Sequence, residues 1–196
     1  MMMRAGISDH SIPARKKIME QKIKSIARVE AGYRNKVNGK AVEILVENAC
    51  TIYERRQIAM IEKNPESMCV LKPIGAQGGL YIARFDKKSK PDFSGVLNNG
   101  QAIIFDVKST EQDKIKASAL SEGQAAYLKR YHSMGAVSFI LVCLQFKDFY
   151  MVPWETWKDM KVLYGHLHMT RNELEPYRVS TANGYIHFLE HITEEG

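Results

Sequence analysis

The stretch KPDFSGVLNNGQAIIFDVKST, residues 90–110, decides the fold of this chain. Its Asn99-Gly100 pair is a strong signal for a tight turn, so we expect the residues on either side to form a β-hairpin. The second strand of this hairpin, residues 102–108, is apolar until it reaches Asp106 and Lys108. Charged side chains therefore stand where a buried strand would carry aliphatic ones.

Alternation along the second strand places Asp106 and Lys108 on the same face, about 7 Å apart, because strand side chains repeat every two residues. Asp92 lies at the start of the first strand, so its carboxylate is expected to reach that of Asp106 across the hairpin. Two neighbouring carboxylates repel each other unless a cation lies between them, and their oxygens favour Mg²⁺ or Mn²⁺. The pattern indicates a metal site at which Lys108 would stabilise charge on a phosphate. The alternative is a salt bridge at the exposed end of a strand.

The composition is that of a single globular domain. The chain has 196 residues, of which 45% are apolar and 26% are charged, and this length is too short for two full-sized domains. No apolar run approaches the roughly 18 residues that cross a bilayer, and the first residues lack a secretory signal, so we expect a cytoplasmic protein without membrane contact.

Two common kinds of cofactor site are not expected. Cys50, Cys69 and Cys143 are far apart and flanked by apolar residues, which predicts buried hydrophobic side chains rather than disulfides or a zinc site. The sequence has no phosphate-binding P-loop, so no nucleotide cofactor is expected.

The net charge of +6 is concentrated near the N-terminus. Residues 1–40 carry ten Lys or Arg and three acidic residues. Such an arm suits a polyanion such as nucleic acid, since each phosphate contact releases counterions. The alternative is a solvated tail that keeps the protein soluble. We expect residues 1–34 to form a basic, partly flexible arm and residues 35–196 to form the main domain.

The hydrophobic pattern predicts an α/β order with a mixed sheet. The expected helices cover residues 16–30, 39–62 and 121–134, with Asn38 and Ser121 as N-caps of the last two. The expected strands, besides the hairpin, cover residues 68–71, 80–85, 136–146, 149–152 and 185–189.

The spacing within the hairpin resembles the signature of the PD-(D/E)xK nucleases. Pro91-Asp92 is followed, after thirteen residues, by Asp106-Val107-Lys108 at the end of an apolar strand. The resemblance implies a restriction-endonuclease-like fold, in which helices flank a mixed sheet, and Mg²⁺-dependent cleavage of phosphodiester bonds.

Further motifs, in their order, resemble those of the RecU Holliday junction resolvases over about residues 35–160. They are GKAVE at residues 39–43, KPDFSG at 90–95, FDVKST at 105–110, Gln124, and GAVSF at 135–139. Asp106 stands where this family often has Glu, and Lys90 stands where it often has a Thr near the metal.

The RecU resemblance implies a set of site residues. The catalytic positions correspond to Glu43, Asp92, Asp106 and Lys108. The positions that hold Mg²⁺ or Mn²⁺ correspond to Asp92, Asp106 and Gln124.

The same resemblance implies a homodimer with a stalk that projects into the centre of a four-way DNA junction. Here residues 71–90 would form the stalk, with DNA contacts from Lys72, Arg84, Lys87, Lys88 and Lys90. The alternative is an ordinary hairpin with solvated lysines.

We therefore predict a Mg²⁺-dependent endonuclease that resolves Holliday junctions in recombination and repair. One alternative keeps the site but cuts other DNA, as another PD-(D/E)xK nuclease would. Another is a recombination accessory protein that binds junctions without cutting them.

Overall fold

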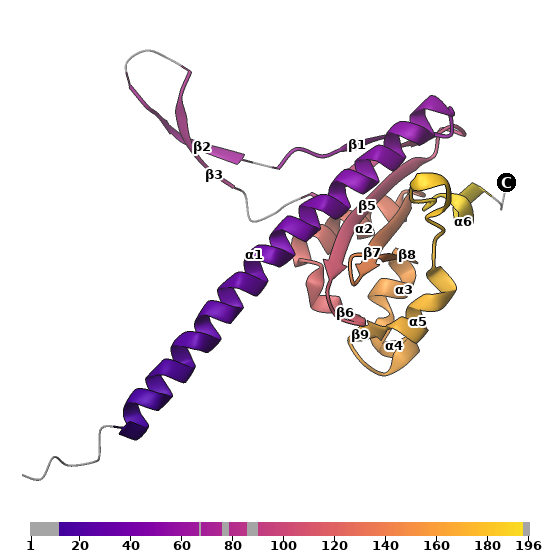
Figure 1. Ribbon diagram of the computed structural model, residues 1–196. Coiled ribbons are helices and arrows are strands. Elements are labelled where there is room, and N and C mark those ends of the chain that lie inside the picture. The colour runs from indigo at the N-terminus through magenta and orange to yellow at the C-terminus, as the bar shows by residue number, and fades with distance from the viewer. Residues whose placement is uncertain (1–11, 67, 76–78, 86–89, 194–196) are drawn as a thin grey trace, which may run out of the picture. The chain divides into compact units, whose positions relative to one another are not determined.

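The computed structural model describes residues 12–66, 68–75, 79–85 and 90–193 (Figure 1). The chain divides into two compact units, Met1–Asn38 and Gly39–Gly196. Helix α1 (Ile12–Arg55) carries all the described residues of the first unit and begins the second. The expected division into an arm over residues 1–34 and a domain over residues 35–196 stays a prediction.

The second unit is built on a five-stranded mixed sheet with the strand order β1-β4-β5-β7-β8. Strands β5 and β7 are parallel, and every other neighbouring pair is antiparallel. The strands of this sheet are β1 (Ala59–Lys63), β4 (Phe93–Leu97), β5 (Ala102–Thr110), β7 (Val137–Leu144) and β8 (Asp148–Pro153).

Two small antiparallel sheets complete the strands. One pairs β2 (Met68–Pro73) with β3 (Tyr81–Phe85), and the other pairs β6 (Lys114–Lys116) with β9 (His168–Thr170). The first of these sheets contains the two strands that were predicted at residues 68–71 and 80–85.

The remaining helices are short apart from α2. They are η1 (Ala117–Ala119), α2 (Glu122–Ser133), α3 (Trp154–Lys158), α4 (Met160–Tyr164), α5 (Arg171–Leu174), η2 (Glu175–Tyr177), η3 (Ala182–Gly184) and α6 (Glu190–Thr193). Helix α2 lies between the parallel strands β5 and β7 in the chain, as a crossover connection requires. The predicted α/β architecture, with a mixed sheet flanked by helices, is confirmed.

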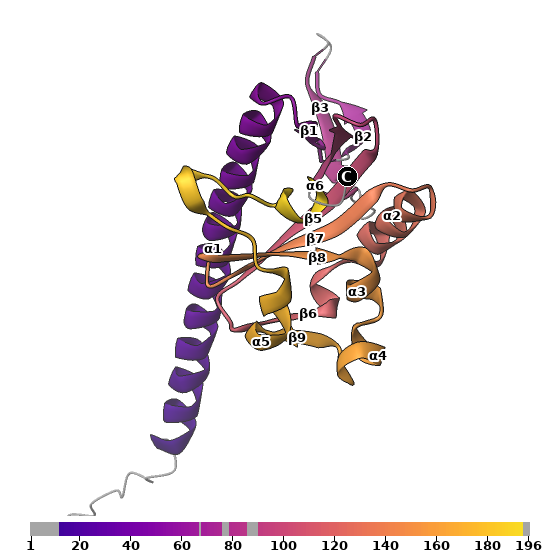
Figure 2. The same ribbon diagram turned by 90° about the vertical axis from the view of Figure 1, so that its right-hand side faces the viewer.

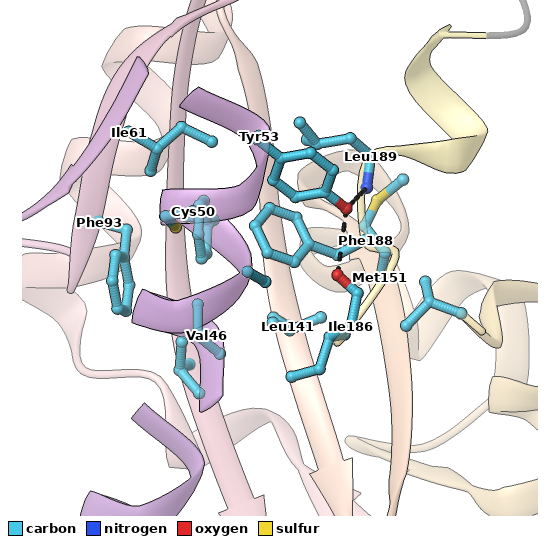
Figure 3. Close-up of a cluster of buried hydrophobic side chains, with 14 of the residues drawn as sticks. Val46, Cys50, Tyr53, Ile61, Phe93, Leu141, Met151, Ile186, Phe188 and Leu189 are labelled. Carbon is cyan, nitrogen blue, oxygen red and sulfur yellow. Dashed lines mark hydrogen bonds between the residues drawn. The ribbon is translucent and has the colours of Figure 1, made fainter. Parts of the chain in front are cut away.

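Helices cover both faces of the sheet. On one face, the part of α1 after Asn38 packs against alternate residues of β5 and β7, with the cluster closed by Phe188 and its neighbours (Figure 3). On the other face, Leu128 of α2 and Trp154 of α3 pack against Ile104 and Ile140. Figure 2 shows α2 and α3 close together beside the sheet. Burial on both faces explains why β7 is apolar apart from Ser138.

The hairpin that decides the fold is formed as predicted. Strand β4 pairs with β5 so that Phe93 lies opposite Phe105 and Gly95 opposite Ile103. The turn between them is closed by a hydrogen bond from the Gly100 N–H to the Leu97 carbonyl, at 2.9 Å. Gly100 has a φ of 83°, which glycine adopts without steric cost.

Helix α1 is continuous, so the predicted break after residue 30 and the predicted N-cap at Asn38 are wrong. Glycine in a helix costs only about 1 kcal/mol relative to alanine, and Gly32 and Gly39 both lie within α1. The local stop signals are therefore overridden.

The same helix ends at Arg55 rather than near residue 62, because a Schellman motif closes it. The Ile58 N–H donates to the Tyr53 carbonyl at 3.0 Å, and the Gln57 N–H donates to the Glu54 carbonyl at 2.9 Å. Gln57 takes the left-handed conformation, with a φ of 56°. The sequence carries no signal for this helix end, because the left-handed position that Gln57 occupies is usually filled by glycine.

Residues 59–62, which were predicted to be helical, form β1 together with Lys63. Ala59 and Ile61 are buried while Met60 and Glu62 are exposed, and this alternation is typical of a strand. Antiparallel pairing with β4 provides hydrogen-bond partners for the backbone N–H and carbonyl groups of this segment.

The predicted strand over residues 185–189 is wrong. The Tyr53 hydroxyl donates to the Ile186 carbonyl at 3.1 Å and accepts from the Leu189 N–H at 3.2 Å (Figure 3). A tyrosine side chain of α1 thus binds this backbone, and no neighbouring strand pairs with it.

The three cysteines differ in exposure. Cys50 and Cys143 are buried as predicted, and burial raises the pKa of each thiol to about 12. Cys69 is exposed, so its predicted burial is wrong, because all the side chains of β2 are exposed. Among the described residues, no helix combines the length and apolar character of a membrane span.

We expect Gly95→Ala to destabilise the protein by about 2 kcal/mol in a denaturant titration. A Cβ atom at Gly95 would collide with the backbone carbonyl of Met60 on the neighbouring strand β1, and backbone cannot move aside cheaply. Gly39→Ala is the matched control, because its Cβ would lie 3.5 Å from the Ser109 hydroxyl oxygen, an ordinary contact. Equal stability of the two variants would contradict the expectation.

Candidate active site

Strand β5 presents Asp106 and Lys108 on the face that α2 covers, as its alternation predicts. The Asp106 side chain is fully buried, and its Oδ2 atom lies 2.6 Å from the Lys108 Nζ atom. That oxygen accepts no hydrogen bond of regular angle within the described part of the chain. One oxygen of this fully buried carboxylate therefore forms an ion pair and still has a lone pair with which it could bind a further cation.

Helix α2 contributes Gln124 to the same cluster. Its Nε2 atom donates to the Asp106 Oδ1 atom at 2.5 Å, and its Oε1 atom accepts from the Lys108 Nζ atom at 3.3 Å. The predicted N-cap, Ser121, is confirmed: Gln124 and Ser121 form a reciprocal capping box. One glutamine therefore fixes the start of α2 and contacts both charged residues of β5.

Asp92 reaches the cluster from the residue before β4. Its Oδ2 atom accepts a hydrogen bond of 2.9 Å from the backbone N–H of Val107, between Asp106 and Lys108. The hairpin thus brings the two aspartates together, as the sequence predicts.

The electrostatics of the two aspartates disfavour negative charge. Burial, together with the charge of Asp92, raises the pKa of Asp106 to about 7 although Lys108 opposes the shift. Burial also raises the pKa of Asp92, and Glu43 adds to the effect. Without a further cation, the protein holds more negative charge here than Lys108 compensates.

Glu43 lies on α1, and its carboxylate forms an ion pair with Lys63, which was not predicted as a site residue. The Lys63 Nζ atom is 2.7 Å from both Glu43 Oε2 and Glu47 Oε1. Lys63 ends β1 opposite Phe93, and its charge opposes the rise in the pKa of Asp92 that burial causes. The sequence of residues 59–63, AMIEK, does not alternate between apolar and polar residues, so it gave no clear signal for this strand.

The donor set fits a hard divalent cation. Asp92 and Asp106 supply carboxylate oxygens, which Mg²⁺ and Mn²⁺ prefer, and Asp106 Oδ2 is buried with ligand capacity free. Over residues 12–66, 68–75, 79–85 and 90–193, no three His, Cys, Asp or Glu side chains gather as candidate ligands. A cation here would therefore have to draw on other oxygen ligands such as water and substrate.

The predicted DNA contacts lie in different parts of the chain. Lys72 on β2 and Arg84 on β3 are exposed in the separate hairpin, and Lys90 is exposed two residues before Asp92. Lys87 and Lys88 lie outside the described residues.

A mixed sheet that brings together Asp92, just before β4, with Asp106 and Lys108 of β5 is the arrangement expected of one class of protein, the endonucleases. A family model described as RecU, Recombination protein U, matches residues 37–194, which is most of the chain. The chain therefore belongs to the RecU family, whose members are Holliday junction resolvases. The resemblance of the sequence motifs to this family is confirmed.

The comparison with solved structures also gives matches. A 1.6 Å resolution structure of Archaeoglobus fulgidus Hjc, a Holliday junction resolvase from an archaeal hyperthermophile, has 12% sequence identity and a TM-score of 0.43. The similarity covers 69% of this chain and 93% of that chain. No curated protein matches the chain significantly.

Proposed function

We propose that this RecU family endonuclease resolves four-way DNA junctions by hydrolysing one phosphodiester bond per subunit of a homodimer, with Mg²⁺ or Mn²⁺ as cofactor. The observation that carries the proposal is the contact of Lys108 with a buried Asp106 beside Asp92, where both aspartates have raised pKa values. Perturbed carboxylates beside a fixed cationic side chain are typical of catalytic sites.

Asp92 and Asp106 would hold the metal ion, with Gln124 as a further ligand if its amide turns its oxygen away from Ser121. When bound, the ion supplies positive charge to a phosphate oxygen and a water of lowered pKa. Gln124 otherwise orients Asp106 and Lys108, since it contacts both.

Lys108 would stabilise the charge that develops on the phosphate during cleavage. Its ammonium is only partly exposed, so a phosphate at its open side would meet a weakly screened charge. Glu43 is the fourth proposed catalytic residue, and Lys63 holds its carboxylate near Asp92.

DNA contacts are proposed for the cations outside this cluster. Lys72 and Arg84 are exposed on the β2–β3 hairpin, which we propose as the stalk that enters the junction. Lys87, Lys88 and Lys90 would bind phosphates near it, in the cytoplasm where cellular DNA is processed.

The test is a cleavage assay on a four-way junction and on linear duplex of matched sequence, each with EDTA, Mg²⁺ or Mn²⁺. We expect paired nicks in the junction that require metal, and far slower cleavage of the duplex. Equal rates on both substrates would instead favour a different DNA nuclease. Junction binding without cleavage in either metal would favour the accessory protein.

A further inference from the structure

Asn64 contacts the segment that carries Asp92 through three hydrogen bonds. Its backbone N–H donates to the Asp92 carbonyl at 2.7 Å, and its Nδ2 atom donates to the Pro91 carbonyl at 2.8 Å. Its Oδ1 atom accepts from the Ser94 hydroxyl, also at 2.8 Å. One side chain therefore binds the chain on both sides of Asp92.

The ladder between β1 and β4 explains why a side chain is needed here. The two strands pair regularly up to Lys63 and Phe93, and Asn64 and Asp92 come next. Pro91 has no N–H, so the ladder cannot continue with regular backbone bonds beyond this point. Beyond the end of strand pairing, the Asn64 carboxamide donates the hydrogen bond that the carbonyl of the buried Pro91 requires.

The position of the Asp92 carboxylate depends on this segment. The Asp92 carboxylate itself accepts a backbone hydrogen bond from the Val107 N–H, which does not fix the backbone of Asp92. Rotation of the Pro91-Asp92 peptide would move that oxygen away from Asp106, and a misplacement of about 1 Å in a catalytic group can cost about a hundredfold in rate.

We propose that Asn64 is a positioning residue that fixes the Pro91-Asp92 peptide and thereby sets the Asp92 carboxylate for metal binding. The inference rests on the proposed function, because it takes Asp92 as a metal ligand. Asn64 acts through Asp92, and Ser94 in turn orients the Asn64 amide. Outer partners of this kind typically contribute about 10- to 100-fold to metal affinity.

The experiment compares Mn²⁺ binding by wild type and Asn64→Ala in titration calorimetry, with no DNA present. Alanine keeps the backbone N–H that binds Asp92, so only the carboxamide contacts are lost. We expect Mn²⁺ binding to weaken about tenfold or more. In junction cleavage, the Mn²⁺ concentration that gives half the maximal rate should rise by a similar factor, a shift that general loss of folded protein would not produce.

Asn99→Ala is the matched control. Asn99 also binds backbone of the hairpin, since its Oδ1 atom accepts from the Gln101 N–H at 2.9 Å just before β5, but it does so at the turn, at the far end of the hairpin from Asp92. Its loss should leave Mn²⁺ binding unchanged. Equal weakening in both asparagine variants would overturn the proposal, and so would wild-type affinity in Asn64→Ala or a wild type that binds no Mn²⁺.

Ser94→Ala keeps the test decisive if Asn64→Ala folds poorly. This change removes only the hydroxyl that orients the amide, so we expect Mn²⁺ binding to weaken by about threefold. The double variant should be no weaker than Asn64→Ala, because both changes act through one carboxamide. Unchanged binding by Ser94→Ala, or additive losses, would overturn the proposal.

Failure of the proposed function would look different. A wild type that binds Mn²⁺ but does not cut four-way junctions would refute the proposed function, whereas the calorimetric comparison would still decide the role of Asn64.

Discussion

Lys108→Ala is expected to lower the rate of junction cleavage by about 100- to 1,000-fold while binding to the junction in EDTA persists. The ammonium would be lost from the place where phosphate charge develops, and preorganised charges of this kind contribute about that much. Single-turnover cleavage with excess enzyme measures the chemical step, and a gel-shift assay in EDTA measures binding.

Lys147→Ala provides the comparison for this variant. Lys147 is an exposed lysine in the turn between β7 and β8, so its removal changes the net charge equally without touching Asp106. Cleavage by Lys108→Ala at the wild-type rate would contradict the role assigned to Lys108. Equal losses of rate in both variants would show that the loss comes from the change in net charge and not from the position of Lys108.

Asp106→Asn is expected to abolish metal-dependent cleavage and, in EDTA at neutral pH, to raise the stability of the protein by about 2 kcal/mol. Asparagine keeps an oxygen for Gln124 but removes a buried negative charge. The gain arises because burial and Asp92 make that charge unfavourable in the folded protein.

The pH dependence follows from the sign of the pKa shift. The pKa of Asp106 is about 7 in the folded protein, and its ordinary value is 3.8. Between these values the folded wild type binds more protons than the unfolded chain, so the stabilising contribution of protonated Asp106 is lost as the pH rises from about 4 to about 7. The stability difference from Asp106→Asn should therefore grow over this range.

Thermal unfolding in EDTA across this pH range measures the difference. Asp159→Asn is the control, since Asp159 is exposed and its nearest cation, Lys158, is 3.8 Å away. A stability gap between Asp106→Asn and wild type that stays constant from acid to neutral pH would contradict the assigned pKa shift.

Local signals in the sequence were sufficient for the hairpin and the charged residues of β5. Asn99-Gly100 signals a turn in which Gly100 adopts the left-handed backbone conformation, and the two-residue period of the strand then places Asp106 and Lys108 together. The capping box of α2 is equally local, since Ser121 and Gln124 are three residues apart.

The error at the end of α1 had the largest consequence for the site. Residues 59–62 were predicted as helix and not as the strand β1, and neither Lys63 nor Asn64 was predicted as a site residue, although both contact residues of the candidate active site or its flanking segment. The strand β1 exists because it pairs with β4, more than thirty residues later in the chain. A local pattern does not encode such a pairing, and tertiary context overrides helix propensity.

The sequence by itself determined the class of fold, the RecU family and the aspartates and lysine at its centre, because turn chemistry, strand alternation and motif order are properties of neighbouring residues. Only the tertiary structure decided what supports them. Lys63 beside Glu43 and Asn64 beside Asp92 come together through the β1–β4 ladder, and long-range backbone pairing depends on the whole folded chain.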